Sequence, residues 1–437
     1  MFPGAKIIAI DDNEDELKEI VSSLRKLRLA CVSYNYPDET PEDGDEFGGI
    51  RLIFLDINLL GGASPRDDAA VYVAPISLLQ RLITDTNGPY ALITWSSSKE
   101  LHDGLIRRLS EIGDMDNRQP FYAMHLPKAD FLNNPEALEA KVREMFSINP
   151  SFAALLDWEK RVSAAGESVL NVIQGLSAQF PGVTPAEKMD KLLSRLSVDA
   201  FGKKHVGEHR FEAANEVLMP LLTDALSSKF FTEEGTNIWD AALTQHESPH
   251  QLSVAATAGL NTSFVFEHRE SLKPYRRGVV LALPAGTSDA SFEERFGASK
   301  KDLRGSVLKI DKPKELSWVL VQVQAACDFA QASASPIPFL LGAIVPGDVV
   351  RKTKNGAPLK LPDSVWVSPD IVSGNGLCDV IFHFEIFHTV TVSITKSVLD
   401  KGEYKVLGRF KDQITSTIAH EHHSHGSRPG FVSIRPT

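Results

Sequence analysis

Short apolar runs, each bounded by polar or turn residues, recur through the first third of the chain. Runs of this kind are typical of strands that are buried on both faces of a parallel sheet. We therefore expect five strands, which lie at Lys6–Ile10, Leu29–Tyr34, Ile50–Leu55, Tyr90–Trp95 and Tyr122–Leu126.

Amphipathic segments separate these runs. In residues 16–28, the apolar side chains of Leu17, Ile20, Val21 and Leu24 recur at the helical spacing and form one face. Similar apolar faces occur at Val73–Thr86, Lys99–Ile112 and Pro135–Phe146. This alternation of strands and helices predicts an α/β fold, with a doubly wound five-stranded parallel sheet in an N-terminal domain of residues 1–148.

Helical periodicity alone continues from residue 149 to about residue 272, which predicts a helical connector domain. Its clearest segments are Phe152–Leu176 and Phe211–Leu226, and Pro220 is expected to kink or break the second of them. Turns are expected at Pro181, Pro185 and Gly235–Asn237.

Residues 273–437 contain runs rich in Val, Ile and Phe, broken by Gly, Pro and Asp. This pattern predicts a β-rich α+β C-terminal domain of unknown function, with a helix at Tyr404–His420. Its expected strands are Gly278–Leu283, Ser306–Ile310, Trp318–Val323, Phe339–Val345, Val365–Val367, Val380–Phe387 and Thr389–Thr395.

Composition and charge narrow the class of protein. The 437 residues are 43% hydrophobic and 24% charged, which is typical of globular domains. No apolar stretch reaches the roughly 18 residues of a membrane helix, and the first residues do not form a signal peptide. Three cysteines favour a reducing cytoplasm over a disulfide framework. A formal net charge of −11 disfavours nucleic acid as a partner.

Residues that can carry chemistry follow four of the five predicted N-terminal strands. Because the carboxyl ends of parallel strands share one edge of a sheet, these side chains should lie close together. They are Asp11 and Asp12 after the first strand, Asp56 after the third, Ser96 with Thr94 two residues earlier at the fourth, and Lys128 after the fifth.

Three neighbouring carboxylates repel one another, so a cation is expected among them. Mg²⁺ is the ion that two carboxylates and a backbone carbonyl hold while leaving room for phosphate oxygens. With the ion in place, one carboxylate can attack a phosphoryl group and form an aspartyl phosphate. A lysine and a hydroxyl would then bind the phosphoryl oxygens.

The sequence resembles the receiver domain of two-component response regulators over about residues 4–148. The motifs that carry this resemblance are IIAIDD, LIFLDIN, ITWSS and HLPKADF. The resemblance implies that Asp56 is the phospho-acceptor and that Mg²⁺ is the cofactor. It also implies that Ser96 or Thr94 supplies the switch hydroxyl and that Lys128 binds the phosphate. The implied metal ligands are Asp11, Asp12, Asp56 and the backbone carbonyl of Asn58, and of the acidic pair it is Asp12 that is expected to contact the metal directly.

Two features depart from the receiver pattern. The loop after Asn58 reads NLLGGASPRDD, which is longer than usual, and the usual Lys-Pro pair is reversed to Pro127-Lys128. Simpler roles also remain for the site residues. Asp11 and Asp12 could cap the helix that follows them. The hydroxyls of Ser96 and Thr94 could likewise cap the helix that follows the fourth strand. Lys128 could be a solvated side chain.

Weaker signals lie in the C-terminal domain. The tract His420–His425 has no second ligand cluster at metal spacing, so a solvated, frayed segment is expected. His383 and His388 are expected on opposite faces of a strand, which argues against a shared metal. Cys327 and Asp328 are weak candidates for lining a pocket. No GxSxG, P-loop or HExxH pattern occurs, so no enzymatic activity is expected beyond the receiver's own phosphorylation and dephosphorylation.

The expected function is that of a response regulator. A histidine kinase, or another phosphohistidine donor, would transfer a phosphoryl group to Asp56, and the chain would signal through contacts with an effector protein. Self-association as a homodimer is left open, and no membrane partner is expected.

Two alternative functions are compatible with the same predicted site. One is a phosphate sink that draws phosphoryl groups from a kinase and keeps a separate effector inactive; the architecture is loosely similar to the large receiver proteins of bacterial anti-phage two-component systems such as Detocs. The other is a Mg²⁺-dependent aspartyl-phosphate hydrolase, for which Asp130 is the candidate second acidic motif.

Overall fold

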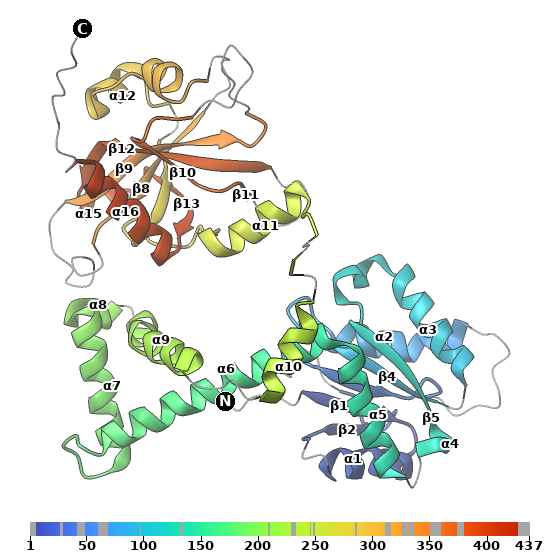
Figure 1. Ribbon diagram of the computed structural model, residues 1–437. Coiled ribbons are helices and arrows are strands. Elements are labelled where there is room, and N and C mark those ends of the chain that lie inside the picture. The colour runs from blue at the N-terminus through green and yellow to red at the C-terminus, as the bar shows by residue number, and fades with distance from the viewer. Residues whose placement is uncertain are drawn as a thin grey trace. The chain divides into compact units, whose positions relative to one another are not determined.

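The computed structural model describes most of the chain (Figure 1). Its contacts divide the protein into two compact units, one of residues 1–166 with 226–248 and one of residues 167–225 with 249–437. The division into three domains at residues 148 and 272 stays a prediction. The described residues are 6–26, 29–41, 49–59, 69–96, 98–131, 134–208, 210–228, 233–244, 246–247, 250–284, 286–310, 316–325, 329, 336–349, 360–373 and 380–426.

A five-stranded sheet forms the centre of the first unit. Its order is β2-β1-β3-β4-β5, and every neighbouring pair is parallel. The predicted parallel α/β sheet is therefore confirmed. The three central strands are completely buried, as their uninterrupted apolar runs required. The strands are β1 (Ile7–Asp11), β2 (Val32–Asn35), β3 (Leu52–Leu55), β4 (Ala91–Ser96) and β5 (Tyr122–Pro127).

Helices cover both faces of this sheet. On one face, α1 (Glu14–Lys26) and α5 (Pro135–Ile148) bury side chains such as Leu17 and Val142 against alternate residues of the strands. On the other face, α2 (Val73–Leu82) and α3 (Lys99–Glu111) form the second core. Short helical segments complete the unit: η2 (Ala69–Tyr72), η3 (Gly113–Arg118) and α4 (Lys128–Phe131).

The long helix α6 (Pro150–Ser177) begins in the core of the first unit. Phe152 is completely buried there and stacks on Phe121. Further along, the carboxylate of Glu159 pairs with Lys6 and Arg51, each at 2.8 Å, beside the amino-terminal ends of β1 and β3. These contacts fix the first half of α6 on the edge of the sheet opposite to the carboxyl ends.

One predicted turn is wrong. Residues 235–237 lie inside α10 (Glu233–Ala242), which also belongs to the first unit. The indole nitrogen of Trp239 donates a hydrogen bond of 2.9 Å to Asp157 of α6. A glycine inside a helix costs only about 1 kcal/mol, so this tertiary contact can outweigh the local preference for a turn.

Helices also make up much of the second unit, in which residues 167–177 of α6 continue. Pro185 is the first residue of α7 (Pro185–Phe201), which Thr184 and Glu187 cap reciprocally. The helix α9 (Arg210–Ser228) is continuous across Pro220, so the expected break does not occur. The other α-helices described in this unit are α8 (Lys203–Glu208), α11 (Val254–Val265), α12 (Asp289–Phe296), α13 (Lys300–Asp302), α15 (Lys396–Leu399) and α16 (Asp412–Gly426).

An antiparallel sheet forms the core of the second unit, as the sequence predicted for its β-rich domain. The order along its main path is β10-β12-β9-β8-β7-β13-β6, and β11 pairs with β12. Figure 1 shows α16 lying beside this sheet. The strands are β6 (Phe266–Glu267), β7 (Val279–Ala282), β8 (Ser317–Gln322), β9 (Ile337–Pro346), β10 (Val365–Val367), β11 (Ile371–Val372), β12 (Ile381–Ile394) and β13 (Lys405–Phe410).

Two local predictions in this unit are wrong. The expected strand at Ser306–Ile310 does not form, because its first two residues end a π-helical turn at Leu303–Val307 and its last three are neither helix nor strand. This turn lets Leu303 and Leu308 both face the core. The expected helix at Tyr404–His420 is instead β13 followed by α16. The burial of residues 405–410 alternates with the period of a strand, so the helix begins only at Asp412.

Within the described residues, no helix combines the length and apolar character that crossing a membrane requires.

Candidate metal centre

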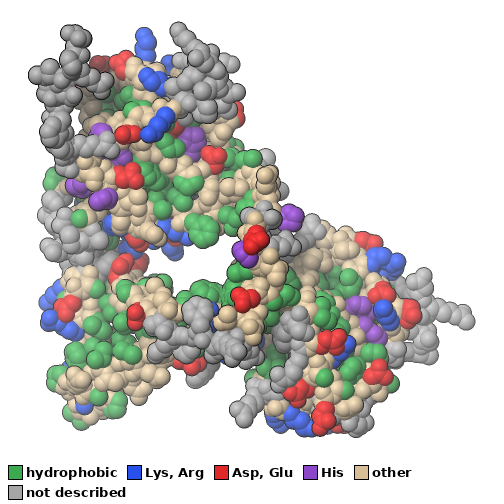
Figure 2. Space-filling model, viewed as in Figure 1, with side chains coloured by type: hydrophobic (Ala, Val, Ile, Leu, Met, Phe, Trp, Pro, Cys, Tyr) green, Lys and Arg blue, Asp and Glu red, His purple; other side chains and the backbone are tan. Residues whose placement is uncertain are grey.

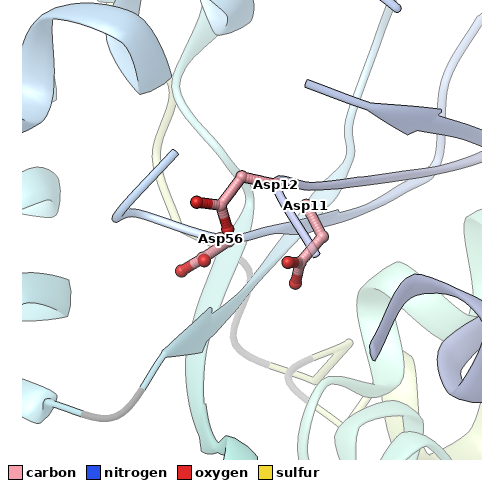
Figure 3. A group of neighbouring side chains, drawn as sticks. All are labelled: Asp11, Asp12 and Asp56. Carbon is pink, nitrogen blue, oxygen red and sulfur yellow. The ribbon is translucent and has the colours of Figure 1, made fainter. Parts of the chain in front are cut away.

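Three carboxylates gather at the carboxyl edge of the five-stranded sheet (Figure 3). Asp11 is the last residue of β1, Asp12 follows it, and Asp56 comes directly after β3. Because β1 and β3 are parallel neighbours, their ends lie side by side, and the Asp56 amide donates to the carbonyl of Ile10 at 2.9 Å. One oxygen from each carboxylate lies within 4.8 Å of the others. Such a group could bind a metal ion.

Lys128 reaches the same place from the end of β5. Its Nζ lies 2.8 Å from Asp56 Oδ2 and 3.1 Å from Asp11 Oδ2. The lysine side chain is only 16% exposed, and those of Asp11 and Asp56 are 0% and 5% exposed. Lys128 is therefore not the solvated side chain of the simpler interpretation, and the structure brings it together with both buried carboxylates.

Asn13 caps α1. Its side-chain oxygen accepts hydrogen bonds from the amides of Asp15 at 3.1 Å and Glu16 at 3.4 Å. The amide of Asn13 in turn donates to Asp11 Oδ1 at 2.9 Å. The helix-capping role that the sequence left open for Asp11 and Asp12 thus belongs to Asn13.

Asp56 is held in a similar way. Its Oδ1 accepts a hydrogen bond of 3.1 Å from the amide of Asn58, while Oδ2 points to Lys128. This turn brings Asn58 next to the cluster, two residues after β3. The role of the Asn58 carbonyl as a metal ligand stays a prediction.

Burial controls the electrostatics of the cluster. It raises the pKa of Asp11 to about 7, because the ammonium of Lys128 offsets only part of the lost hydration and Asp56 adds repulsion. Burial likewise raises the pKa of Asp56, against the opposing effect of Lys128. For Lys128, burial acts to lower the pKa, but Asp56 and Asp11 outweigh it and raise the pKa. The single charge of Lys128 therefore does not neutralise the carboxylates of the cluster. A divalent cation would supply the positive charge that is missing.

Mg²⁺ binding should consequently depend on pH. A carboxyl group loses its proton before it binds a cation. With a pKa of about 7, Asp11 is mostly protonated at pH 6 and mostly ionised at pH 8. We expect the affinity for Mg²⁺ to rise about tenfold between these two pH values. Calorimetric titration at each pH measures it.

The stability of the metal-free protein should show the opposite trend. Folding raises the pKa of Asp11 from its usual 3.8 to about 7. The contribution of Asp11 to the free energy of unfolding is therefore complete below pH 3.8 and is lost as the pH rises through about 7. Mg²⁺ should therefore raise Tm more at pH 8 than at pH 6. An equal Mg²⁺-induced shift at both pH values would contradict this account of Asp11.

The two candidate hydroxyls have different surroundings. Ser96 is the last residue of β4 and pairs in register with Pro127; its hydroxyl donates to the carbonyl of Ser98 at 3.0 Å. Thr94 lies two residues inside the strand, and its hydroxyl is 2.8 Å from Nδ1 of His102. Both residues are buried. Ser96 is the nearer of the two, along the chain, to the carboxyl edge, but which one acts as the switch stays open.

Two residues near the site were missed by the sequence interpretation. Glu16 of α1 places Oε2 2.5 Å from Lys128 Nζ, and His125 of β5 places Nε2 3.2 Å from Ser96 Oγ. A signal for Glu16 was present, because it lies in the first turn of the helix that follows Asp12. His125 lies on β5, three residues before Lys128, and no motif marks it.

The other candidate residues are not members of this cluster. Asp130 is exposed on α4. His383 pairs with Glu385 at 3.0 Å. The tract at residues 420–425 is helical within α16, not frayed, and Nδ1 of His422 lies 2.8 Å from the carbonyl oxygen of His388. Cys327 and Asp328 fall outside the described residues. Across the described ranges, the acidic cluster is the one group of three such side chains with metal-ligand spacing.

Comparison with known proteins gives little similarity. No protein-family model matches the chain, and no curated protein matches it. A trimeric coiled-coil segment of yeast Spc42, solved as a fusion, has 16% identity and a TM-score of 0.18 over 38% of this chain and 98% of that chain. NtrX from Brucella abortus has 16% identity and a TM-score of 0.21 over 45% of this chain and 47% of its own, so this chain spans about half of that NtrX chain. TM-scores this low establish no shared fold.

Proposed function

We propose that the first unit is a receiver domain that accepts a phosphoryl group on Asp56 from a phosphohistidine donor when Mg²⁺ is bound. The observation that carries this proposal is the buried carboxylate of Asp56 beside Asp11 and Asp12, with the ammonium of Lys128 at 2.8 Å. A nucleophilic carboxylate, metal ligands and a cation for the phosphoryl oxygens then stand at one edge of one sheet.

The residues divide the chemistry among them. Asp11, Asp12, Asp56 and the Asn58 carbonyl would hold Mg²⁺, which supplies positive charge where phosphoryl oxygens collect. An Asp56 oxygen forms the new bond to phosphorus, and the phosphorus–nitrogen bond of the donor breaks with its electron pair returning to the imidazole. Lys128, freed from Asp56, pairs with a phosphoryl oxygen. The hydroxyl of Ser96 or Thr94 would bind another.

A protein partner for the rest of the chain forms part of this proposal. The second unit exposes large apolar side chains on its helices, including Leu170 at 67%, Phe211 at 75% and Phe264 at 72% exposure. Figure 2 shows hydrophobic side chains, in green, among the polar ones on the visible face of the protein. Exposed apolar side chains favour contact with the apolar surface of another protein, whereas nucleic acid requires clustered positive charge. A histidine kinase would be the donor, and an effector protein the reader of the phosphorylated state.

Acetyl phosphate tests the chemistry without the kinase. Wild-type protein should take up a radioactive phosphoryl group from this donor in the presence of Mg²⁺ and lose the reaction when EDTA removes the metal. The label should be stable in acid and labile in alkali, as an acyl phosphate is. Absence of label at saturating Mg²⁺, or label that persists in EDTA, would refute the proposal.

We further expect no binding to duplex DNA near physiological salt, with or without phosphorylation. The chain has a formal net charge of −11, and DNA binding depends on neutralising phosphates with clustered Lys and Arg. Fluorescence anisotropy with a labelled duplex measures this directly. Sub-micromolar affinity that weakens steeply with salt would replace the protein partner with a transcriptional output.

A further inference from the structure

The ammonium of Lys128 is shared among three carboxylates from different elements. Two of them, Asp11 and Asp56, are the buried residues at the strand ends. The third is Glu16 in the first turn of α1, whose Oε2 lies 2.5 Å from Nζ. The side-chain amide of Asn13 donates to the other oxygen of Glu16 at 3.1 Å, so the carboxylate is held from both sides.

Lys128 and a divalent cation would compete for the same atoms. Nζ lies closest to Oδ2 of both Asp11 and Asp56, with a longer contact of 3.4 Å to Oδ1 of Asp11, and Oδ1 of each carboxylate already accepts a backbone amide. The oxygens that a metal would take are therefore those that hold the lysine now. Of the three carboxylates around Nζ, Glu16 alone is not a proposed metal ligand.

We propose that Glu16 is a positioning residue for Lys128: it retains the ammonium at the edge of the cluster when Mg²⁺ takes Asp11 and Asp56, and it competes with the incoming phosphoryl oxygens for that ammonium. This inference rests on the proposed phosphorylation of Asp56. Glu16 therefore has two opposed effects, because it favours metal binding and restrains phosphoryl transfer.

Each effect has a separate physical cause. Without the Glu16 charge, the ammonium has only Asp11 and Asp56 as anionic partners, and the site loses one unit of the negative charge that attracts Mg²⁺. Once Mg²⁺ saturates the site, the same loss reduces repulsion of an anionic donor and leaves Lys128 available to it. In the reaction with acetyl phosphate, an Asp56 oxygen bonds to phosphorus and acetate leaves with the electron pair of the broken oxygen–phosphorus bond.

The variant Glu16→Gln tests this, with Glu14→Gln as the matched control. Glutamine keeps the size of the side chain and an oxygen for Asn13. Glu14 lies in the same first turn of α1, and its exposed carboxylate pairs with Lys18 instead of Lys128. Both variants therefore change the net charge and the helix terminus equally, and thermal unfolding verifies that both are folded.

Titration with Mg²⁺ alone gives the first readout. We expect Glu16→Gln to raise the Kd for Mg²⁺ about threefold to tenfold, and Glu14→Gln to change it less than about twofold. This measurement needs no phosphorylation. If wild-type protein binds Mg²⁺ but takes no phosphoryl group, the proposed function fails while the metal-binding half of the inference is still tested.

The rate of phosphorylation at saturating Mg²⁺ gives the second readout. Acetyl phosphate should label Glu16→Gln about threefold to tenfold faster than wild type, and Glu14→Gln at the wild-type rate. A weaker metal site combined with faster transfer is a pattern that simple structural damage does not produce. If Glu16→Gln lowers both the affinity for Mg²⁺ and the rate of labelling, or matches Glu14→Gln in both, the inference is wrong.

Discussion

Replacing Asp56 with asparagine is expected to abolish labelling by acetyl phosphate, with a loss of at least about a hundredfold. The amide of asparagine is not a nucleophile at neutral pH, and it is a weaker ligand for Mg²⁺ than a carboxylate. The side chain at this position is almost completely buried, and asparagine has the same shape, so the fold should persist. Scintillation counting of the precipitated protein measures the label.

Asp130→Asn is the matched control for this experiment. Asp130 follows Lys128 by two residues near the same edge of the sheet, but it is exposed on α4. We expect undiminished labelling of this variant. Loss of label in Asp130→Asn would favour the aspartyl-phosphate hydrolase, in which a second acidic motif takes part. Normal labelling of Asp56→Asn would instead place the acceptor elsewhere.

Loss of the acidic pair should weaken Mg²⁺ binding strongly, and more so at Asp12 than at Asp11. The Asp11 carboxylate already accepts from the amide of Asn13 and from Lys128, whereas the resemblance to receivers assigns the direct metal contact to Asp12. We expect Asp12→Ala to raise the Kd for Mg²⁺ at least about tenfold. Fluorescence of the buried Trp95, one residue before the end of β4, is a suitable signal.

The exposed carboxylate of Asp15, in the first turn of α1, provides the control. Asp15→Ala removes a negative charge close to the site in sequence, and its Kd should stay within about twofold of wild type. Unchanged Mg²⁺ affinity in both Asp11→Ala and Asp12→Ala would mean that the strand-end carboxylates do not form the metal centre.

Much of the first unit was predictable from sequence because its strands are buried on both faces. A run such as residues 91–96 leaves little choice of structure, and parallel neighbours then bring their carboxyl ends to one edge. The grouping of Asp11, Asp12 and Asp56 follows from that topology alone. Lys128 was found for the same reason, since it follows the edge strand of the same sheet.

What the sequence did not predict depends on tertiary contacts. Glu16 belongs to a helix, and its role emerges only when β5 brings Lys128 to within 2.5 Å of it. In the second unit, strand and helix signals meet within a few residues, as at residues 404–420, and burial against the sheet decides between them. Gly235 shows the same principle, because a contact between Trp239 and α6 overrides a local turn preference.

The position of the phosphoryl group is the most direct test of the central claim. Wild-type protein is incubated with acetyl phosphate and Mg²⁺, treated with sodium borohydride, and digested for peptide mass mapping. Borohydride reduces an aspartyl phosphate to homoserine, which marks the acceptor permanently. We predict homoserine at Asp56 alone, and only in samples that contained Mg²⁺. Homoserine at another aspartate, or none in a protein that binds Mg²⁺, would contradict the assignment of this site as a receiver.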